Sequence, residues 1–195
     1  TGNAVFAVTV LGVLWMVVWS GRVRWLGAPV VLVGLLFTLI APAPDVLITA
    51  DGRHVALRMA DGSMALLRDR AGDYVRTTLA EAAAYGGEFN ALAEKDAATC
   101  SRDLCEVTLP VRERGPVRLL VTRTNLRLPW QALVDACARA DIVIADRRLP
   151  RGCAPDWVKL DRPTLSAMGG AVILLDRREI VSGRDPRDRH PWVLR

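Results

Sequence analysis

The stretch ACARADIVIADRRLPRGC, residues 136–153, decides how this chain is interpreted. Its middle, Asp141–Ala145, is a short run of β-branched and apolar residues behind an acid, which is typical of a buried strand. Arg147 and Arg148 follow directly, and a proline and a glycine then break the chain. We therefore expect a central strand whose polar, basic exit lies at one edge of a sheet.

Further strands and helices are predicted on both sides of this strand. Three short apolar runs within residues 45–68 are separated by Asp-Gly pairs, and this pattern predicts a three-stranded meander. The other predicted elements are strands at 106–109, 117–122 and 171–175, and helices at 74–85, at 130–138 behind a first-turn proline, and after a capping Asp161.

This alternation of strands and helices favours an α/β domain, or an α+β domain, built in layers around a mixed sheet. We expect the domain to occupy residues 45–183, followed by a charged, loose tail at 184–195. The chain has 195 residues, and roughly 150 of them are enough for one domain with its own core.

The first 44 residues form a separate, strongly apolar region. Residues 1–21 carry no charge, and after Arg22 and Arg24 the chain is again uncharged through Pro44. Each run approaches the ~20 residues that a bilayer-spanning helix needs. Tryptophans gather where the runs meet, as at a membrane interface. We predict two antiparallel transmembrane helices that end a longer membrane domain. Two buried helices of a soluble protein are the alternative.

The loop between the two runs indicates their orientation. It carries two arginines and no acid, so the positive-inside rule places it in the cytoplasm. Both predicted spans then lead outward. We therefore expect a multi-pass protein of the inner (plasma) membrane, in contact with the lipid bilayer, whose domain after Pro44 lies in the periplasm.

Four cysteines, Cys100, Cys105, Cys137 and Cys153, lie in the predicted exported domain. Disulfides are permitted outside the cytoplasm, and four cysteines allow three pairings. We favour Cys100–Cys105, across a turn, and Cys137–Cys153, which flank the central strand and its exit. A zinc site would need CxxC pairs or histidine partners, and the chain has neither that spacing nor more than two histidines.

Arg147, Arg148 and Arg151, at the exit of the central strand, are the candidates for a phosphate contact. The planar guanidinium suits phosphate because it can donate two parallel hydrogen bonds. The alternative is a solvated loop held by a disulfide. The sequence shows no obvious aromatic platform for stacking nucleic-acid bases. Trp130 and Trp157 are the only candidates, and core packing would explain both equally well.

Several segments, taken in order, resemble one family. They are the two apolar runs, a proline exit at 41–44, DVLITADGRH at 45–54, DGSMALLR at 61–68, ADIVIADRRLP at 140–150 and LLD at 174–176. Together they resemble the C-terminal part of a ComEC-type DNA-internalisation competence protein, of the proteobacterial branch with a short C-terminal region. The resemblance covers nearly the whole chain, and the order of the segments carries it.

That resemblance implies a function in natural transformation. In the family, a polytopic inner-membrane part forms the channel for a single DNA strand. The exported part often resembles a metallo-β-lactamase fold, proposed to degrade the other strand. An active member needs an HxHxDH motif, because two metal ions must activate water at the phosphodiester. This sequence has no HxHxDH motif. The resemblance therefore implies a degenerate relative of that fold, with no cofactor and no catalytic or metal-binding residue carried over.

The remaining candidate ligands have simpler interpretations. His54, on a predicted apolar strand, is expected to be structural or at the surface, and His190 lies in the tail. Asp141 and Asp146 could bind a cation, although two carboxylates that flank a strand are usually a cap and a solvated end.

The favoured function is non-enzymatic: the chain is the C-terminal portion of an inner-membrane DNA-uptake channel, with an exported domain that guides DNA or supports the channel. Its partners would be single-stranded DNA, the remaining transmembrane part of the same protein and other competence proteins. One alternative is an active metal-dependent phosphodiesterase or nuclease with an unusual ligand set. The other is the exported domain of an unrelated membrane protein.

Overall fold

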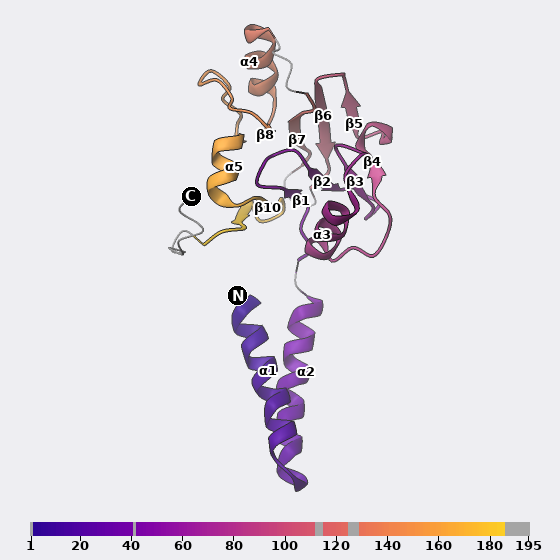
Figure 1. The fold of residues 1–195 in the computed structure, drawn as a ribbon, viewed down its shortest axis with the longest axis vertical. Helices are drawn as coiled ribbons and strands as arrows, with labels where there is room; N and C mark the ends of the chain where they lie inside the picture. Colours follow the sequence, from indigo (N-terminus) through magenta and orange to yellow (C-terminus); the bar gives the residue numbers. More distant parts are fainter. Residues whose placement is uncertain (1, 41, 112–114, 125–128, 186–195) are drawn as a thin grey trace. The chain divides into compact units, whose positions relative to one another are not determined.

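A computed structural model describes residues 2–40, 42–111, 115–124 and 129–185 of the protein. The chain divides into two compact units, Thr1–Pro42 and Ala43–Arg195. The first unit is helical, and all the described strands belong to the second (Figure 1).

The first unit is a helical hairpin (Figure 1). Helices α1 (Gly2–Val18) and α2 (Gly27–Leu39) run antiparallel and are joined by the 3-10 helix η1 (Gly21–Leu26). They approach closely at glycines, since a Cβ atom added at Gly27 or Gly34 would collide with α1. Close contacts at small residues are typical of helix pairs in membranes.

Only one helix of the described residues, Gly21–Leu39 with η1 included, is long and apolar enough to cross a membrane; the apolar helix Ala4–Val18 is shorter. Large apolar side chains on this hairpin point outward, and those of Phe6, Val17 and Leu39 are 71%, 76% and 82% exposed. Such a surface suits lipid better than water. The predicted apolar hairpin is present, and one of its helices has the length of a span.

The second unit contains two mixed sheets. The six-stranded sheet has the order β11-β10-β1-β2-β3-β4. Its strands are β1 (Val46–Ile48), β2 (Val55–Arg58), β3 (Met64–Leu66), β4 (Asn90–Ala91), β10 (Ala171–Leu174) and β11 (Glu179–Ser182). Neighbouring strands are antiparallel except for β3 and β4.

The five-stranded sheet contains the central strand that the sequence predicts. Its order is β5 (Ala98–Cys100), β6 (Leu104–Leu109), β7 (Val117–Thr122), β8 (Ile142–Ile144) and β9 (Val158–Leu160). Strands β5, β6 and β7 pair antiparallel, whereas β7, β8 and β9 are parallel. The carboxyl ends of β7, β8 and β9 therefore meet at one edge of the sheet.

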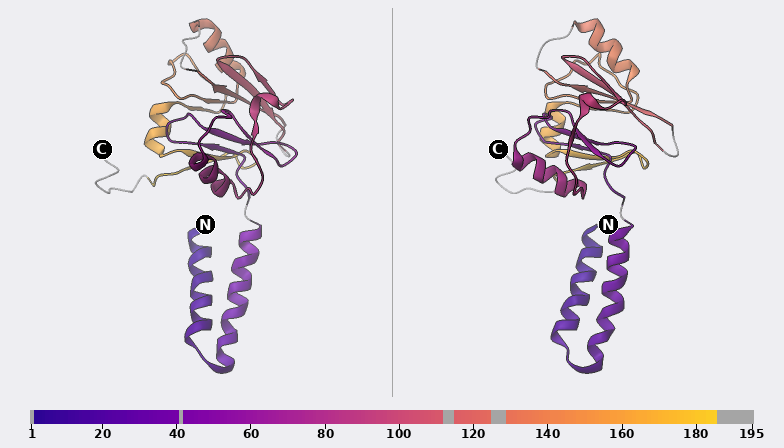
Figure 2. Two further views of the ribbon diagram at one scale, coloured as in Figure 1. Left: turned by 45° about the vertical axis from the view of Figure 1, so that its right-hand side comes forward. Right: turned by 90° about the vertical axis from the view of Figure 1, so that its right-hand side faces the viewer.

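The two sheets pack face to face, and helices cover their outer faces (Figure 2). Helix α3 (Asp73–Ala83) covers the six-stranded sheet through Leu79 and Ala83. Helix α4 (Trp130–Arg139) covers the five-stranded sheet through Leu133 and Ala136. Successive side chains of a strand point to opposite faces of the sheet, so neighbouring residues belong to different layers of the core. In β1, for example, Val46 belongs to the core between the sheets, whereas Leu47 belongs to the cluster under α3.

The described part of the domain also contains two shorter helices. The 3-10 helix η2 (Leu92–Glu94) follows β4, and α5 (Arg162–Met168) follows β9. The buried Leu165 joins α5 to the core between the sheets. The Asp161 carboxylate caps α5, as the sequence predicts.

The predicted elements of this domain are confirmed to within about two residues at each end, and so is a mixed α and β domain. The strands form two mixed sheets rather than one. Strands β4, β5, β9 and β11 were not predicted, and with them the strands divide into two sheets. His54 lies just before β2 rather than on a strand. The backbone of Arg184, expected in a loose tail, donates to the Met168 carbonyl at 2.8 Å. The rest of the tail, from 186 onward, lies outside the described residues.

Candidate functional site

Polar side chains are buried at one edge of the five-stranded sheet. In the described part of the chain, the buried polar or charged residues are Thr122, Asp146 and Asp161, at 1%, 4% and 8% exposure. Thr122 ends β7, Asp146 follows β8 and Asp161 follows β9. All three lie at the carboxyl ends of parallel strands, where α/β sheets commonly place their ligands. This edge is therefore the candidate site.

Asp146 is held by an ion pair that joins the two sheets. Arg68, which follows β3 of the six-stranded sheet, donates from Nη2 to Asp146 Oδ2 at 2.7 Å. The same guanidinium donates to the Arg123 carbonyl at 2.8 Å, and the Thr122 hydroxyl lies 3.4 Å from Asp146 Oδ1. The Asp146 side chain is only 2% exposed. Its prediction as a solvated strand end is therefore wrong.

Asp161 is also turned inward. Its Oδ1 accepts from the Thr164 hydroxyl at 2.7 Å and the Thr164 amide at 3.3 Å, and its Oδ2 accepts from the Leu149 amide at 3.3 Å. Burial by itself would raise the pKa of this carboxyl, but these hydrogen bonds outweigh it and lower the pKa below its usual value. Asp161 therefore stays ionised and ties the exit of β8 to α5.

Basic side chains lie on the outside of the same edge. Arg148 and Arg151 are exposed, and Arg147 is partly buried. The Arg162 amide donates to the Arg147 carbonyl at 3.3 Å, and Lys159 Nζ donates to the Pro150 carbonyl at 3.4 Å. We call residues 147–152 the arginine loop. The basic edge is Arg147, Arg148, Arg151, Lys159 and Arg162.

The structure thus places Lys159 and Arg162 beside the loop that contains the three predicted arginines. Sequence reasoning missed these two residues because β9 was not predicted, so nothing placed Lys159 beside the exit of β8. The segment VKLDRP, with its alternating Val-Lys-Leu and a proline after the cap, was the available signal.

Both disulfides have the pairing that the sequence favours. Cys137 of α4 is bonded to Cys153 with S–S 2.00 Å, and Cys100 is bonded to Cys105 with S–S 2.02 Å. Cys137 and Cys153 are 0% and 1% exposed. The first bond fastens the end of the arginine loop to α4, and the second closes the hairpin of β5 and β6.

The turn between β1 and β2 closes one side of the site. Gly52 has φ +68°, and a Cβ atom there would lie 2.8 Å from the Ala145 carbonyl oxygen and 3.1 Å from the Asp146 Cα. Only glycine fits this position, because the turn needs a left-handed conformation and a close approach to the exit of β8. The turn therefore lies directly against the backbone of Asp146 at the exit of β8.

The candidate metal ligands do not assemble in the described residues. No group of three or more His, Cys, Asp or Glu side chains lies together there. His54 is partly buried, and its Nδ1 atom has no hydrogen-bond partner among the described residues. Asp141, at the opposite end of β8 from Asp146, accepts the Arg118 amide at 2.7 Å. His190 lies outside the described residues.

The two candidate tryptophans have different surroundings. Trp130, the first residue of α4, is 59% exposed and lies against Gly152 of the arginine loop. Trp157 is partly buried against the core, and the Arg178 guanidinium lies 5.2 Å from its ring centroid. Trp157 and Arg178 line a pocket of about 380 Å³, where Arg178 is also paired with Asp156 at 3.2 Å. Core packing thus explains Trp157 but not Trp130.

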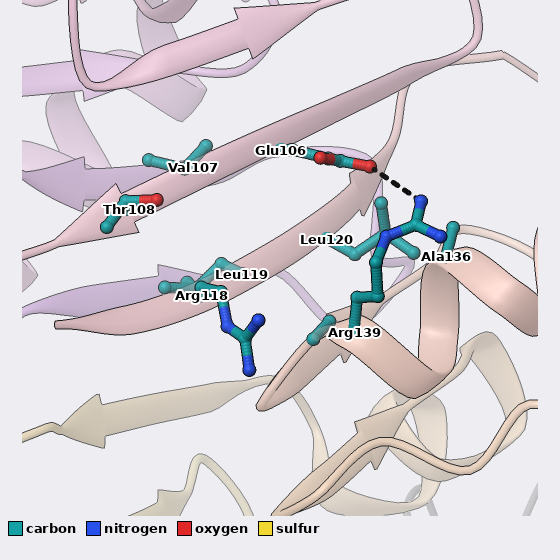
Figure 3. Close-up of a pocket in the computed structure, with 9 residues that line it drawn as sticks. Glu106, Val107, Thr108, Arg118, Leu119, Leu120, Ala136 and Arg139 are labelled. Carbon is teal, nitrogen blue, oxygen red and sulfur yellow. Dashed lines mark ion pairs between the residues drawn. The ribbon is translucent and has the colours of Figure 1, made fainter.

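A second arginine-bearing surface lies on the outer face of the five-stranded sheet, beside α4. A pocket of about 130 Å³ lies there, lined in part by Glu106, Arg118 and Arg139 (Figure 3). Arg139 is 3.7 Å from Glu106, and Arg118 is 3.8 Å from Asp141. We call this surface the paired face, because Arg118 and Arg139 each have an acidic neighbour there.

The apolar hairpin and the disulfides bear on location. One helix near the N-terminus is long and apolar enough to cross a membrane, and the second unit contains two disulfides. Disulfides persist mainly outside the cytoplasm. Together these features favour a membrane-anchored domain on the outer side of a membrane.

No protein-family model, curated protein or solved structure matches this chain.

Proposed function

We propose that this chain is the C-terminal portion of an inner-membrane DNA-uptake channel for natural transformation. In this proposal its exported domain holds a DNA strand through phosphate contacts at the basic edge and does not cleave it. The observation that carries the proposal is the arrangement of charge there. The acids Asp146 and Asp161 are buried and hydrogen-bonded, whereas Arg148 and Arg151 point to solvent.

The charge of this surface suits a polyanion. The basic edge has five cationic side chains, and the carboxylates beside them are occupied by Arg68, Thr164 and backbone amides. No ion pair joins Arg148 or Arg151 to a carboxylate among the described residues. Their guanidinium groups can therefore donate to phosphate without first breaking an internal contact.

The occupied carboxylates also support a role without catalysis. A metal ion bound to Asp146 would have to displace the guanidinium of Arg68, which lies 2.7 Å from Oδ2. That guanidinium already supplies the positive charge that the buried carboxylate needs. We therefore propose a degenerate relative of the metallo-β-lactamase-like nuclease domain, in which an arginine bridges the two sheets at this edge.

The proposed location has two spans in the inner membrane and a domain in the periplasm. The hairpin turn contains Arg22 and Arg24 and no acid, which favours a cytoplasmic position. The two disulfides suit an oxidising compartment on the other side. The proposed partners are the lipid bilayer, single-stranded DNA, the remaining transmembrane part of the same protein and other competence proteins.

Titration of the full chain in detergent against a labelled single-stranded oligonucleotide, at two salt concentrations, tests this proposal. Each phosphate contact adds about 0.7 to the slope of log affinity against log salt, so the double variant Arg148→Gln/Arg151→Gln should lower that slope by about 1.4. The matched control is Arg118→Gln/Arg139→Gln on the paired face, which should change the slope by less than half as much.

Equal losses in the two double variants would show that DNA is held by net charge rather than by the basic edge. Bound metal with cleavage of the oligonucleotide in the same sample would contradict the non-catalytic role and favour the nuclease. A chain that binds no DNA would refute the proposal and favour the exported domain of an unrelated membrane protein.

A further inference from the structure

Trp130 is an exposed aromatic ring against the arginine loop. Of the large apolar side chains in the described part of the second unit, three are exposed: Tyr74, Trp130 and Val181. Trp130 is the one placed against the arginine loop. A Cβ atom added at Gly152 would lie 3.1 Å from its Cζ2 atom and 3.7 Å from its Cη2 atom. The ring thus contacts the loop at a glycine, while Trp130 as a whole is 59% exposed to solvent.

The position of this ring is fixed by its surroundings. Trp130 begins α4, and the same helix contains Cys137, whose disulfide to Cys153 holds the end of the arginine loop. Val134, one turn further along α4, also lies against Gly152. The ring and the arginines are therefore presented together by one cross-linked unit. A preorganised surface loses less conformational entropy when it binds.

We infer that Trp130 stacks on an unpaired base of the strand whose phosphates the basic edge binds, so that this surface selects single-stranded over double-stranded nucleic acid. The inference rests on the proposed function, which already names single-stranded DNA, and adds the residue that distinguishes this form from duplex DNA. The chemistry is general. An arginine groove beside an exposed aromatic ring is the usual way to hold a single strand, because every unpaired base has a π-face.

Duplex DNA cannot make the same stacking contact with this surface. Its bases are stacked on each other inside the helix, so an aromatic ring at the rim of a phosphate-binding surface gains little from contact with it. The phosphates of a duplex remain available to Arg148 and Arg151. The arginines are therefore expected to bind both forms, and Trp130 is expected to favour only the form with free bases.

An oligonucleotide with abasic sites separates stacking from phosphate contacts. It has the length and charge of the normal strand but lacks the bases. The full chain in detergent should bind the normal single strand about 5- to 150-fold more tightly than the abasic strand, which is the range for loss of one stacked base. Trp130→Leu should remove most of this difference and leave duplex affinity within about twofold. Trp130→Phe, which keeps an aromatic ring, should restore most of it.

The variants should fold, because Trp130 is exposed at the first residue of its helix. Unchanged thermal unfolding of Trp130→Leu would confirm this. Equal, salt-dependent binding of normal and abasic strands by the unaltered chain would overturn this inference and leave the proposed function standing. So would equal losses of single-strand and duplex affinity in Trp130→Leu. Failure to bind any DNA would refute the proposed function and this inference together.

Discussion

Two surfaces of the five-stranded sheet present arginines, and they differ in where their acids lie. At the basic edge, Asp146 directly precedes the arginine loop in the chain, is buried, and is paired with Arg68 of the other sheet. On the paired face, beside α4, Glu106 is on the surface 3.7 Å from Arg139 (Figure 3). The paired face is thus locally neutral. The basic edge has cations outside and anions inside.

This difference indicates what each surface can do. Exposed ion pairs contribute little to stability, and their charges cancel for any approaching ligand. At the basic edge the buried Asp146 is already paired with Arg68, and no ion pair joins the exposed Arg148 or Arg151 to a carboxylate among the described residues. Counting arginines in the sequence does not distinguish the two surfaces. The burial of the neighbouring carboxylates does.

The largest expected effect comes from removing the cation beside the buried acid. Arg68→Met would leave Asp146 buried without its partner, so the free energy of unfolding should fall by about 3 kcal/mol. Arg118→Met breaks an exposed pair on the paired face and should cost less than about 1 kcal/mol. Chemical denaturation of the full chain in detergent, followed by near-ultraviolet circular dichroism, would measure both. Equal losses would contradict the distinction between the two surfaces.

The two disulfides are also expected to differ, both in their contribution to stability and in their effect on DNA binding. The Cys137–Cys153 bond spans 16 residues and the Cys100–Cys105 bond spans 5. Loop-closure entropy then predicts losses of about 3 and about 2 kcal/mol for the respective double serine variants. Only the first bond holds the arginine loop, so only Cys137→Ser/Cys153→Ser should also weaken DNA binding. Equal weakening of DNA binding by Cys100→Ser/Cys105→Ser would contradict the role of the Cys137–Cys153 bond in holding the arginine loop.

A smaller effect is expected at Asp161, and it depends on pH. Its pKa is lowered in the folded state, so its carboxylate stabilises the fold above the unfolded value of 3.8. That contribution is lost as the pH falls through the folded pKa. Asp161→Ala should cost about 1 kcal/mol at pH 7, as for other helix caps. Denaturation at pH 7 and below pH 3 should show the difference from the unaltered chain shrinking at the lower pH. If the difference in the free energy of unfolding between Asp161→Ala and the unaltered chain were the same at both pH values, a stabilising role for the ionised, hydrogen-bonded Asp161 carboxylate would be contradicted.

Local sequence patterns predict the strands with strong apolar runs. The Asp-Gly turns located the meander, and the run at 142–144 located β8. The pairing of Cys137 with Cys153 followed from their positions on either side of that strand. In each of these cases the signal lies within one short stretch of sequence, at most 16 residues apart for the two cysteines, so it can be read without knowing the rest of the fold.

Contacts between distant residues could not be predicted in this way. Arg68 and Asp146 are 78 residues apart, and nothing local distinguishes Arg68 from a turn residue. Strand β9 has three residues, including a lysine, and its pairing with β8 depends on a parallel connection through the arginine loop. The division into two sheets depends on such short strands. The ion pair between Arg68 and Asp146, and the burial of this acid at the basic edge, therefore depend on how the two sheets pack face to face.

Photocrosslinking tests the central claim, that the basic edge holds a nucleic-acid strand without cleaving it. A single-stranded oligonucleotide substituted with bromodeoxyuridine would be irradiated with the full chain in detergent, and the adducts would be located by peptide mass spectrometry. The account predicts adducts at Trp130 or in the peptide that contains the arginine loop, on an intact strand, and their loss in Arg148→Gln/Arg151→Gln. Adducts confined to the paired face, or a cleaved strand, would contradict it.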